Sequence, residues 1–569
     1  MHDAAYTMSD RNISVALPNK KAWELINKAL YCEKSLDLDA TIPNSDLQLC
    51  TLTLQEIQAR LADTLSITHL FACYHVQKQL LRNKHFALTH VLYEEPLAFA
   101  SKLQQELYAD RQRTLKERPL LGCILSVKDS VAYKGTFSTS GFIKGFQEPY
   151  KETAGLITYL ESKGALVTCK GNVPQALMTF ESDNNIFGNT SNPHNEERTA
   201  GGSSGGEGAL LASNCVNCAV GSDIAGSLRF PALFCGIYSL KPTAGRYADV
   251  EPNMARQWPN FRSSGDTQFI IRPTIGPMAR SAADIEVLAR VMAAYHEVDL
   301  KLPPLPWRSV ECPTRIGMIR SFPAVMEPCT ATARALDQAA ACLGSTSGVQ
   351  LIDIDITDLV EELFVNAASG FFKDEQLVRV AKGKQRLGEP LIDGFSEFSR
   401  LFSIPAFLLR KLGSLLASPR EQLYIRALLQ SIDCGTAAME TRQDELQQEV
   451  IRRFKEAGVE VALAIGVFPA IRKHTAKSCD FLCFHCFIWN YLNFPVGAVP
   501  VTRVRPDEQQ YTSAHVDKIT ETLKFNMQGS AGLPVGVQVV GLPWHEEAVV
   551  EVMKKLEPHM DSMDWRFSR

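Results

Sequence analysis

A glycine-rich segment from Ala200 to Gly245 constrains the fold of this chain more than any other feature of the sequence. Many glycines in a short stretch are costly in backbone entropy unless the chain must adopt positive φ or approach another group closely. The apolar runs ALLA, CAVG and RFPALFCGIYSL interrupt the glycines, and a solvated linker would not carry them. A phosphate-binding loop does not fit either, because no GK[ST] follows the glycines and no GxGxxG register matches.

The rest of the chain alternates between two kinds of segment. From Pro119 onward, short apolar runs such as LLGCILSV, ALVTC, VALAIGVF and VQVVGL alternate with amphipathic stretches such as Ala282 to Tyr295. This alternation predicts an α/β fold with a large mixed β-sheet covered by helices. The length of 569 residues is sufficient for a large core.

The first part of the chain, residues 1–95, is predicted to be an N-terminal helical arm. Helical apolar spacing runs from Lys20 to Leu30, and a second helix is expected from Leu54 to Leu65. Residues 96–569 are expected to form one large domain.

Charge and cysteine content exclude several classes of function. Lys and Arg number 59 against 63 Asp and Glu, a net charge of −4, which is too balanced for a nucleic-acid binder. The 15 cysteines are an odd set, and no apolar signal segment precedes them, so we expect reduced thiols in an intracellular protein. Two CxxC pairs, Cys215/Cys218 and Cys483/Cys486, lie too far apart for a zinc ribbon, so no metal or other cofactor is predicted.

One segment, Phe481 to Val501, is long enough to span a bilayer and contains no Asp, Glu, Lys or Arg. Pro495 and Pro500 would break its backbone ladder, and its polar side chains would need partners. A core helix followed by a buried strand is therefore predicted here, and no clear transmembrane helix is expected.

Gly201 to Gly205 fits the GxSxG pattern, with Ser203 at the position of an α/β-hydrolase nucleophile. That mechanism needs a later acid and a histidine. Asp353 or Asp355 followed by His485 or His545 could supply them, but no spacing singles out one pair.

Three short motifs resemble the Ser-Ser-Lys set of the amidase signature family. They are SVKDS with Lys128, GGSSGG with Ser203 and Ser204, and GSDIAGSLRFP with Ser227. The resemblance extends roughly from Pro119 to Leu556. Within the family, segments such as VPQALMTFESDNNIFGNTSNP and AGLPVGVQVVGLPW are most similar to the branch that hydrolyses fatty acid amides. The resemblance implies the amidase signature fold, with a twisted mixed sheet surrounded by helices, and a serine hydrolase activity.

The residue types suit amide hydrolysis. A serine hydroxyl needs a base, and the leaving amine needs an acid, so one group must accept a proton and later return it. Lys128 can do both if burial lowers the pKa of its ammonium toward neutrality. Alternation along a strand would point the neighbouring Asp129 to the other face. The resemblance implies that Ser203, on a cis peptide bond, relays the proton between Lys128 and the nucleophile Ser227.

The turn before Ser227 is expected to form an oxyanion hole from consecutive backbone N–H groups. The expected donors are Ile224, Ala225, Gly226 and Ser227. Ala225 stands where the most similar relatives have Gly, and its Cβ would matter if that position needed positive φ. Ser204, Asp223 and Arg229 are expected to support the loop, although a surface ion pair between the last two remains open from the sequence.

The substrate is expected to be a fatty acid amide, on the strength of the resemblance. It implies an apolar channel lined by Leu177, Met178, Phe180, Phe371, Phe372 and Phe487. It also implies a membrane-binding cap within 396–430 that includes Phe402, Phe407, Leu408 and Leu412, with Arg400, Arg410, Lys411 and Arg420 as basic neighbours. On composition alone, the same segment could be an ordinary amphipathic core helix.

The resemblance further implies peripheral or monotopic contact with an intracellular membrane and a homodimer. Two other functions remain open: an amidase of another substrate class, including a subunit that supplies ammonia for tRNA-dependent amidation, and a non-catalytic lipid-binding protein.

Overall fold

The computed structural model describes residues 43, 45–61, 65–143, 148–248, 270–346, 348–373, 404–416 and 418–560. Of residues 80, 82, 83, 412–416 and 480 it describes the backbone only. The predicted helix over 20–30 and Phe402 lie outside these ranges.

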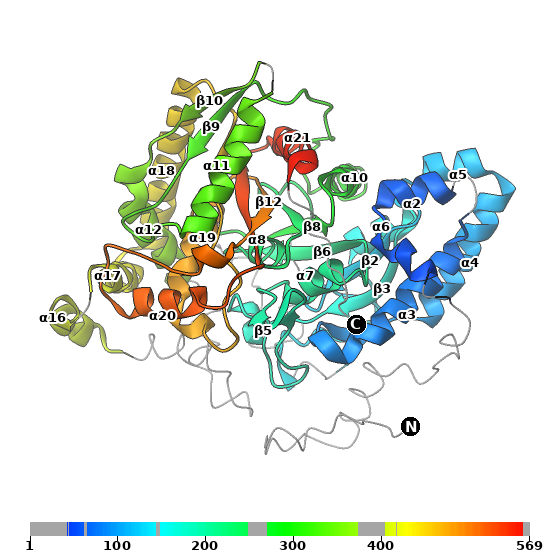
Figure 1. Cartoon of the computed structure of the whole chain (residues 1–569), viewed down its shortest axis with the longest axis horizontal. Helices are drawn as coiled ribbons and strands as arrows, with labels where there is room; N and C mark the ends of the chain where they lie inside the picture. The colour runs from blue at the N-terminus through cyan, green and yellow to red at the C-terminus, as the bar shows by residue number, and fades with distance from the viewer. Residues whose placement is uncertain are drawn as a thin grey trace.

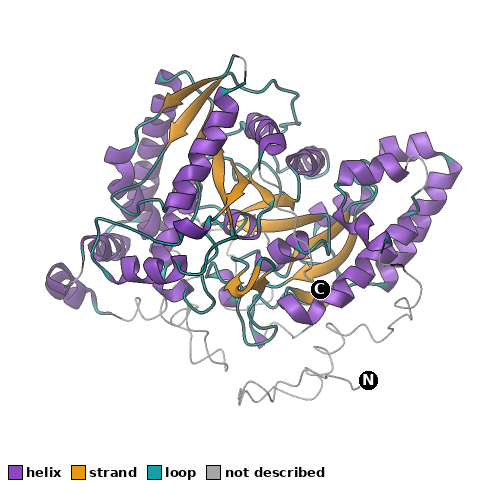
Figure 2. Cartoon of the chain, viewed as in Figure 1, coloured by secondary structure: helices purple, strands orange, loops and turns teal. Residues whose placement is uncertain are grey.

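The core is an 11-stranded sheet in the order β1-β3-β2-β6-β8-β7-β12-β13-β11-β9-β10, which crosses the molecule between layers of helices (Figure 2). Its strands are β1 (Leu88–Val91), β2 (Ile124–Lys128), β3 (Leu166–Gly171), β6 (Cys218–Asp223), β7 (Tyr238–Lys241), β8 (Thr274–Ala279), β9 (Arg315–Ile319), β10 (Gln350–Asp353), β11 (Val461–Ile465), β12 (Val496–Arg503) and β13 (Pro534–Gly541). A separate two-stranded sheet pairs β4 (Ser191–Asn192) with β5 (Asn195–Thr199).

The sheet is mixed, as predicted. β2 runs parallel to β3 and β6, and β9 runs parallel to β10 and β11, whereas the other pairs are antiparallel. The four apolar runs singled out in the sequence form β2, β3, β11 and β13. Every residue of these strands is buried, which explains why they appear as continuous apolar runs rather than alternating ones.

The helices are α2 (Leu54–Leu61), α3 (Ile67–His85), α4 (Glu94–Ala109), α5 (Arg111–Glu117), α6 (Gly155–Ser162), α7 (Gly205–Ala212), α8 (Arg229–Cys235), α10 (Ala282–Ala293), α11 (Thr330–Gly344), α12 (Val360–Lys373), α16 (Ala406–Leu416), α17 (Pro419–Asp433), α18 (Thr436–Glu456), α19 (Phe484–Tyr491), α20 (Lys518–Met527) and α21 (Glu546–Leu556). Short 3₁₀ helices are η3 (Asp46–Thr51), η5 (Gln175–Leu177), η6 (Ala294–Glu297), η7 (Thr357–Leu359), η8 (Ala476–Ser478), η9 (Asp480–Cys483), η10 (Pro506–Glu508) and η11 (Glu557–His559).

Helices cover both faces of the sheet. On β13, a Cβ at Gly541 would contact Val549 of α21, and a Cβ at Gly536 would contact Leu233 of α8. Positions an odd number of residues apart point to opposite faces of a strand, so α8 and α21 pack on opposite sides.

The segment before residue 95 is helical over most of its described length, and it also contributes β1, which pairs antiparallel with β3 at the end of the sheet. α2 begins at the predicted Leu54 and ends at Leu61. Thr53 hydrogen-bonds Glu56 through both its amide nitrogen and its hydroxyl, which fixes the start of this helix.

The apolar segment Phe481–Val501 forms the end of η9, the buried helix α19 and most of β12. The prediction of a core helix followed by a buried strand is therefore correct. Within the described ranges, no helix is both long and apolar enough to cross a bilayer.

Candidate active site

The three residues of the predicted triad come from separate elements that meet at one edge of the sheet. Lys128 is the last residue of β2, Ser203 precedes α7, and Ser227 lies in the turn between β6 and α8. β2 and β6 are parallel neighbours, with Val127 paired to Val220, so their carboxyl ends lie at the same edge. The fold therefore brings together segments that are far apart in the sequence.

Lys128 is 1% exposed, and its Nζ lies 2.7 Å from Ser203 Oγ. The same Nζ lies 2.9 Å from Ser222 Oγ on β6. The neighbouring Asp129 points elsewhere, since its Oδ2 accepts hydrogen bonds from the amides of Thr139 and Ser140. Asp129 and Lys128 therefore have different partners, and Ser222 is a contact of Lys128 that the motifs did not predict.

The peptide bond between Gly202 and Ser203 is cis, as the resemblance implied. Just after it, the amide of Ser204 donates to the carbonyl of Ser227 over 3.2 Å, and the Ser204 hydroxyl donates to the carbonyl of Ser222 over 3.3 Å. Ser204 thus ties the start of α7 to the turn that carries Ser227. Among the described residues, no hydrogen bond joins the hydroxyls of Ser203 and Ser227, so the second link of the predicted relay is not formed in this state.

Asp223 organises the turn that follows β6. Its Oδ1 accepts from the amide of Gly226 at 2.7 Å, and its Oδ2 accepts from the amide of Leu228 at 3.1 Å. The Gly226 amide is therefore occupied and does not serve as an oxyanion donor in this geometry, which corrects the predicted set of four. Within the described part of the chain, the amides of Ile224, Ala225 and Ser227 donate to no protein group, and these three stay candidates.

The left-handed position of the turn is Gly226, with φ of +114°. An added Cβ there would lie 2.7 Å from Cys486 Cβ, so conformation and space both require glycine. Ala225 does not have positive φ, and its Cβ is therefore accommodated without backbone strain.

Asp223 and Arg229 form a fully buried ion pair rather than a surface one, with Arg229 Nε 3.0 Å from Asp223 Oδ2. Burial alone would raise the pKa of Asp223, but the guanidinium of Arg229 outweighs it and lowers the pKa below its usual value. Arg229 also donates to the Cys486 carbonyl and to Gln538, and Asn490 donates to Asp223. The expected supporting pair is thus buried beneath the turn.

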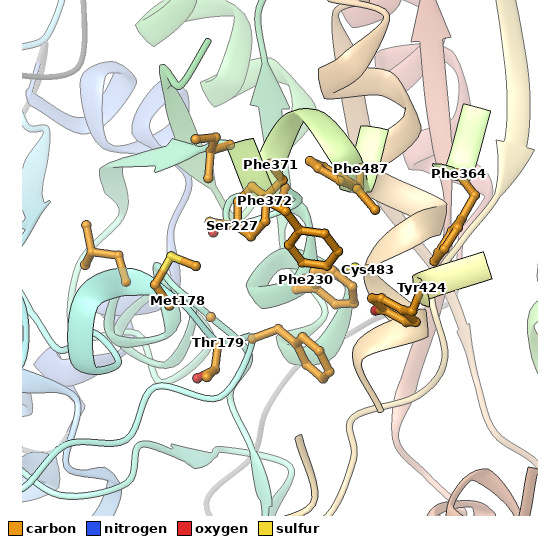
Figure 3. Close-up of a pocket in the computed structure, with 16 residues that line it drawn as sticks. Met178, Thr179, Ser227, Phe230, Phe364, Phe371, Phe372, Tyr424, Cys483 and Phe487 are labelled. Atoms are coloured by element: carbon orange, nitrogen blue, oxygen red, sulfur yellow. The ribbon is translucent and has the colours of Figure 1, made fainter. Parts of the chain in front are cut away.

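An apolar cavity of about 830 Å³, counted with the part open to solvent, leads to Ser227. Figure 3 shows aromatic side chains gathered around it, including Phe371, Phe372, Phe487 and Tyr424. Its full lining is Leu177, Met178, Thr179, Phe180, Gly202, Ile224, Ala225, Ser227, Phe230, Phe364, Ala368, Phe371, Phe372, Tyr424, Cys483 and Phe487. All six expected channel residues are in this set.

Seven residues of this lining were not predicted from the sequence: Thr179, Gly202, Phe230, Phe364, Ala368, Tyr424 and Cys483. A signal for two of them was present: Phe364, Ala368 and Phe371 follow one another at helical spacing along α12 and therefore share one face. Tyr424 of α17 reaches the cavity through ring contacts with Phe364 and Phe372, which only the fold reveals.

The predicted cap is in part helix α16, which lies at the periphery of the molecule (Figure 1). Phe407 is 64% exposed and Leu408 37% exposed, whereas Leu409 is buried. Phe402 lies outside the described residues, and of Leu412 only the backbone is described. Arg420, expected among the exposed basic neighbours, is instead fully buried and paired with Asp517, which corrects that expectation.

The histidine-based alternative has no geometric support. Within the described ranges no histidine hydrogen-bonds Ser203, and Asp353 is an exposed partner of Arg320. Both ring nitrogens of His485 are buried, with no hydrogen-bond partner in the described part of the chain. Among the described residues, no three His, Cys, Asp or Glu side chains are grouped as a metal site would require.

The chain matches a known protein family over most of its length. The amidase family model matches residues 71–550, and the chain belongs to this family. The chain is 29% identical over 471 residues to fatty-acid amide hydrolase 1 of Sus scrofa, covering 79% of this chain and 78% of that protein. It is 27% identical over 464 residues to fatty acid amide hydrolase 1 of Caenorhabditis elegans, covering 77% of this chain and 76% of that protein. A solved structure of fatty acid amide hydrolase superposes with a TM-score of 0.72 at 21% identity, covering 98% and 94% of the two chains, and supports the fold alone.

Proposed function

We propose that this amidase hydrolyses fatty acid amides, such as N-acylethanolamines and primary fatty acid amides, with Ser227 as nucleophile. The observation that carries the proposal is the 2.7 Å contact between the buried Lys128 amine and Ser203, next to Ser227 at an apolar cavity. A base, a relay hydroxyl and a nucleophile are the groups that acyl transfer requires.

In the proposed reaction, the Ser227 hydroxyl attacks the amide carbonyl while its proton passes to Ser203 and the Ser203 proton passes to the neutral amine of Lys128. The amides of Ile224, Ala225 and Ser227 are the donors available to the oxyanion. When the C–N bond breaks, the leaving nitrogen takes a proton from Ser203, and Lys128 returns one to Ser203. Water then repeats the sequence on the ester, which releases the fatty acid and restores Ser227.

The lining of the cavity supports a lipid substrate. Its lining is aromatic and aliphatic over most of its extent, with Thr179, Tyr424 and Cys483 among the few polar groups. An alkyl chain transferred from water into such a lining gains about 0.8 kcal/mol per buried CH₂. A small polar amide would gain little from it, which favours a lipid amide over the amidotransferase alternative.

The test is labelling by a fluorophosphonate probe followed by peptide mapping, together with hydrolysis of a series of amides of rising chain length. We expect the label on Ser227, a Ser227→Ala variant that neither labels nor hydrolyses, and kcat/KM that rises with chain length. Label on another serine, or hydrolysis retained in Ser227→Ala, would refute the nucleophile. A preference for short amides would refute the substrate class, and binding of lipid amides without labelling would favour the lipid-binding alternative.

We further propose that α16 contacts a membrane surface, which its exposed Phe407 and Leu408 support. Replacement of both residues by Asp is expected to reduce binding to anionic phospholipid vesicles and to leave hydrolysis of a short soluble amide unchanged. Replacement of the exposed Val516, which lies outside this helix, is the matched control. Unchanged vesicle binding in the α16 variant would refute the proposal. Intracellular membrane association and a homodimer stay predictions.

A further inference from the structure

Glu207 is a buried carboxyl that the proposed proton relay does not use. It is the third residue of α7, and the side chain is fully enclosed. Its Oε1 accepts a hydrogen bond from Ser126 Oγ over 3.1 Å. Its Oε2 has no hydrogen-bond partner among the described residues. Burying a carboxyl oxygen without a hydrogen-bond partner costs free energy of folding, so a functional role for Glu207 is worth considering.

The carboxyl of Glu207 lies on the same side of the sheet as the side chain of Lys128. Ser126 precedes Lys128 by two residues on β2, so the two side chains share one face of the strand. Gly171 lies opposite Lys128 in the parallel register of β2 and β3. A Cβ at Gly171 would lie 2.1 Å from Glu207 Oε1, so the carboxyl rests directly on that glycine. The carboxyl of Glu207 is thus packed against the strand pair at the level of the proposed base.

Glu207 interacts electrostatically with Lys128 of β2 and with Cys169 of β3. Burial raises the pKa of Glu207 to about 7, while the positive charge of Lys128 acts in the opposite direction. On β3, Cys169 interacts with Glu207, and burial raises the pKa of that thiol. Beyond Cys169 lies the buried Lys78 of α3, whose pKa is lowered by burial. In this dry environment a proton on Glu207 and the charge on Lys128 affect each other.

We propose that Glu207 is a positioning residue that sets the charge of Lys128 and so fixes the pH range in which the amine is free to act as base. This inference rests on the proposed function. With Glu207 ionised, the ammonium form of Lys128 is stabilised and the base is blocked. With Glu207 protonated, the neutral amine is favoured. The carboxyl touches neither substrate nor nucleophile and acts through Lys128 alone.

The variant that tests this is Glu207→Gln, which keeps the shape and removes the charge. Without the carboxylate, the ammonium loses stabilisation, so the acid limb of the kcat/KM profile is expected to move to lower pH by about one unit. Glu508→Gln, at another buried glutamate that pairs with Arg334, is the matched control and should leave the limb in place. A merely structural role would lower activity at all pH values without moving the limb, and that result would overturn the proposal.

A second measurement needs neither activity nor a stable Glu207→Gln variant. Coupling is reciprocal, so Lys128→Ala is expected to raise the pH at which Glu207 ionises, measured by infrared titration of the protonated carboxyl band. Assignment of the band uses Ser126→Ala, which removes the hydrogen bond to Oε1 and should shift it. An unmoved titration in Lys128→Ala overturns the coupling. Loss of hydrolysis and labelling in the unmutated enzyme would instead overturn the proposed function and leave this coupling measurable.

Discussion

Replacement of Asp223 by Asn should destabilise the protein severely, because Asp223 neutralises a buried charge and accepts many hydrogen bonds. Its Oδ1 accepts from Gly226, Arg229 and Asn490, and its Oδ2 accepts from Leu228 and Arg229. An amide has one acceptor oxygen, so whichever way it turns, at least two of these donors meet its NH₂ group.

The magnitude follows from this count. Each buried donor left without an acceptor costs about 1–3 kcal/mol. The same change removes the countercharge of Arg229, whose side chain is 0% exposed, and breaking a buried pair from one side costs about 3–5 kcal/mol. The two figures describe the same contacts and do not add, so we expect a loss of about 3–5 kcal/mol in the free energy of unfolding.

The assay is urea denaturation followed by tryptophan fluorescence, with Trp489 as a buried reporter that contacts Phe322 and Phe494. Asp353→Asn is the matched control, since Asp353 pairs with Arg320 at an exposed position. A surface pair of this kind contributes about 0–1 kcal/mol. The labelling rate of Ser227 should also fall by about tenfold or more, because the amide of Gly226 and the turn lose their anchor.

The contribution of Asp223 to the free energy of unfolding should depend on pH in one direction. The pKa of Asp223 is lowered in the folded protein from its usual 3.8, so its stabilising contribution is complete above that value and is lost as the pH falls toward the lowered one. The stability difference between the unmutated protein and Asp223→Asn should therefore be constant near neutral pH and shrink only in strong acid. Equal stability of Asp223→Asn and Asp353→Asn, with unchanged labelling, would refute this account of the turn.

Three further outcomes test the site. Lys128→Ala should lower hydrolysis by about 10²–10⁴-fold and move the optimum to higher pH, measured as a kcat/KM profile; an unchanged rate would exclude Lys128 as the base. Gly226→Ala should destabilise the protein by about 1–3 kcal/mol, whereas Gly435→Ala, with no described atom within 4 Å of the new Cβ, should not, and urea denaturation compares the two. Phe487→Trp should fill part of the cavity and raise KM for long-chain amides more than for short ones; equal changes for both would place Phe487 outside the substrate path.

Much of the fold was predictable because local pattern and burial agree. The runs that became β2, β3, β11 and β13 are rich in apolar residues, and every residue of these strands is buried. The amphipathic stretch from Ala282 formed α10 with Ser281 as its N-cap. The order of the strands was not predictable, since the pairing of β6 with β8 and of β12 with β7 depends on contacts between distant segments.

The residues of the site that belong to short motifs were predictable from the sequence. The contacts that depend on how distant segments pack together were less predictable. The motifs located Lys128, Ser203 and Ser227, and the structure places them close together. They did not reveal that Asp223 occupies the Gly226 amide, because that depends on how the turn closes. Nor did the basic pattern around the predicted cap distinguish the buried Arg420 from exposed cations, since only the fold brings Asp517 against it.

The turn that carries Ser227 is formed by neighbouring residues, but the contacts that support it come from distant parts of the chain. Asp223, Gly226 and Ser227 lie within a few residues of one another, yet Arg229 beneath them reaches the carbonyl of Cys486 and the side chain of Gln538. Cys486 belongs to α19 and Gln538 to β13, both from the last part of the chain. Without α19 and β13, the guanidinium of Arg229 would lack three of its five hydrogen-bond acceptors, so the geometry of the turn depends on segments from the last part of the chain. A short motif thus places the serine, and the completed sheet holds it in position.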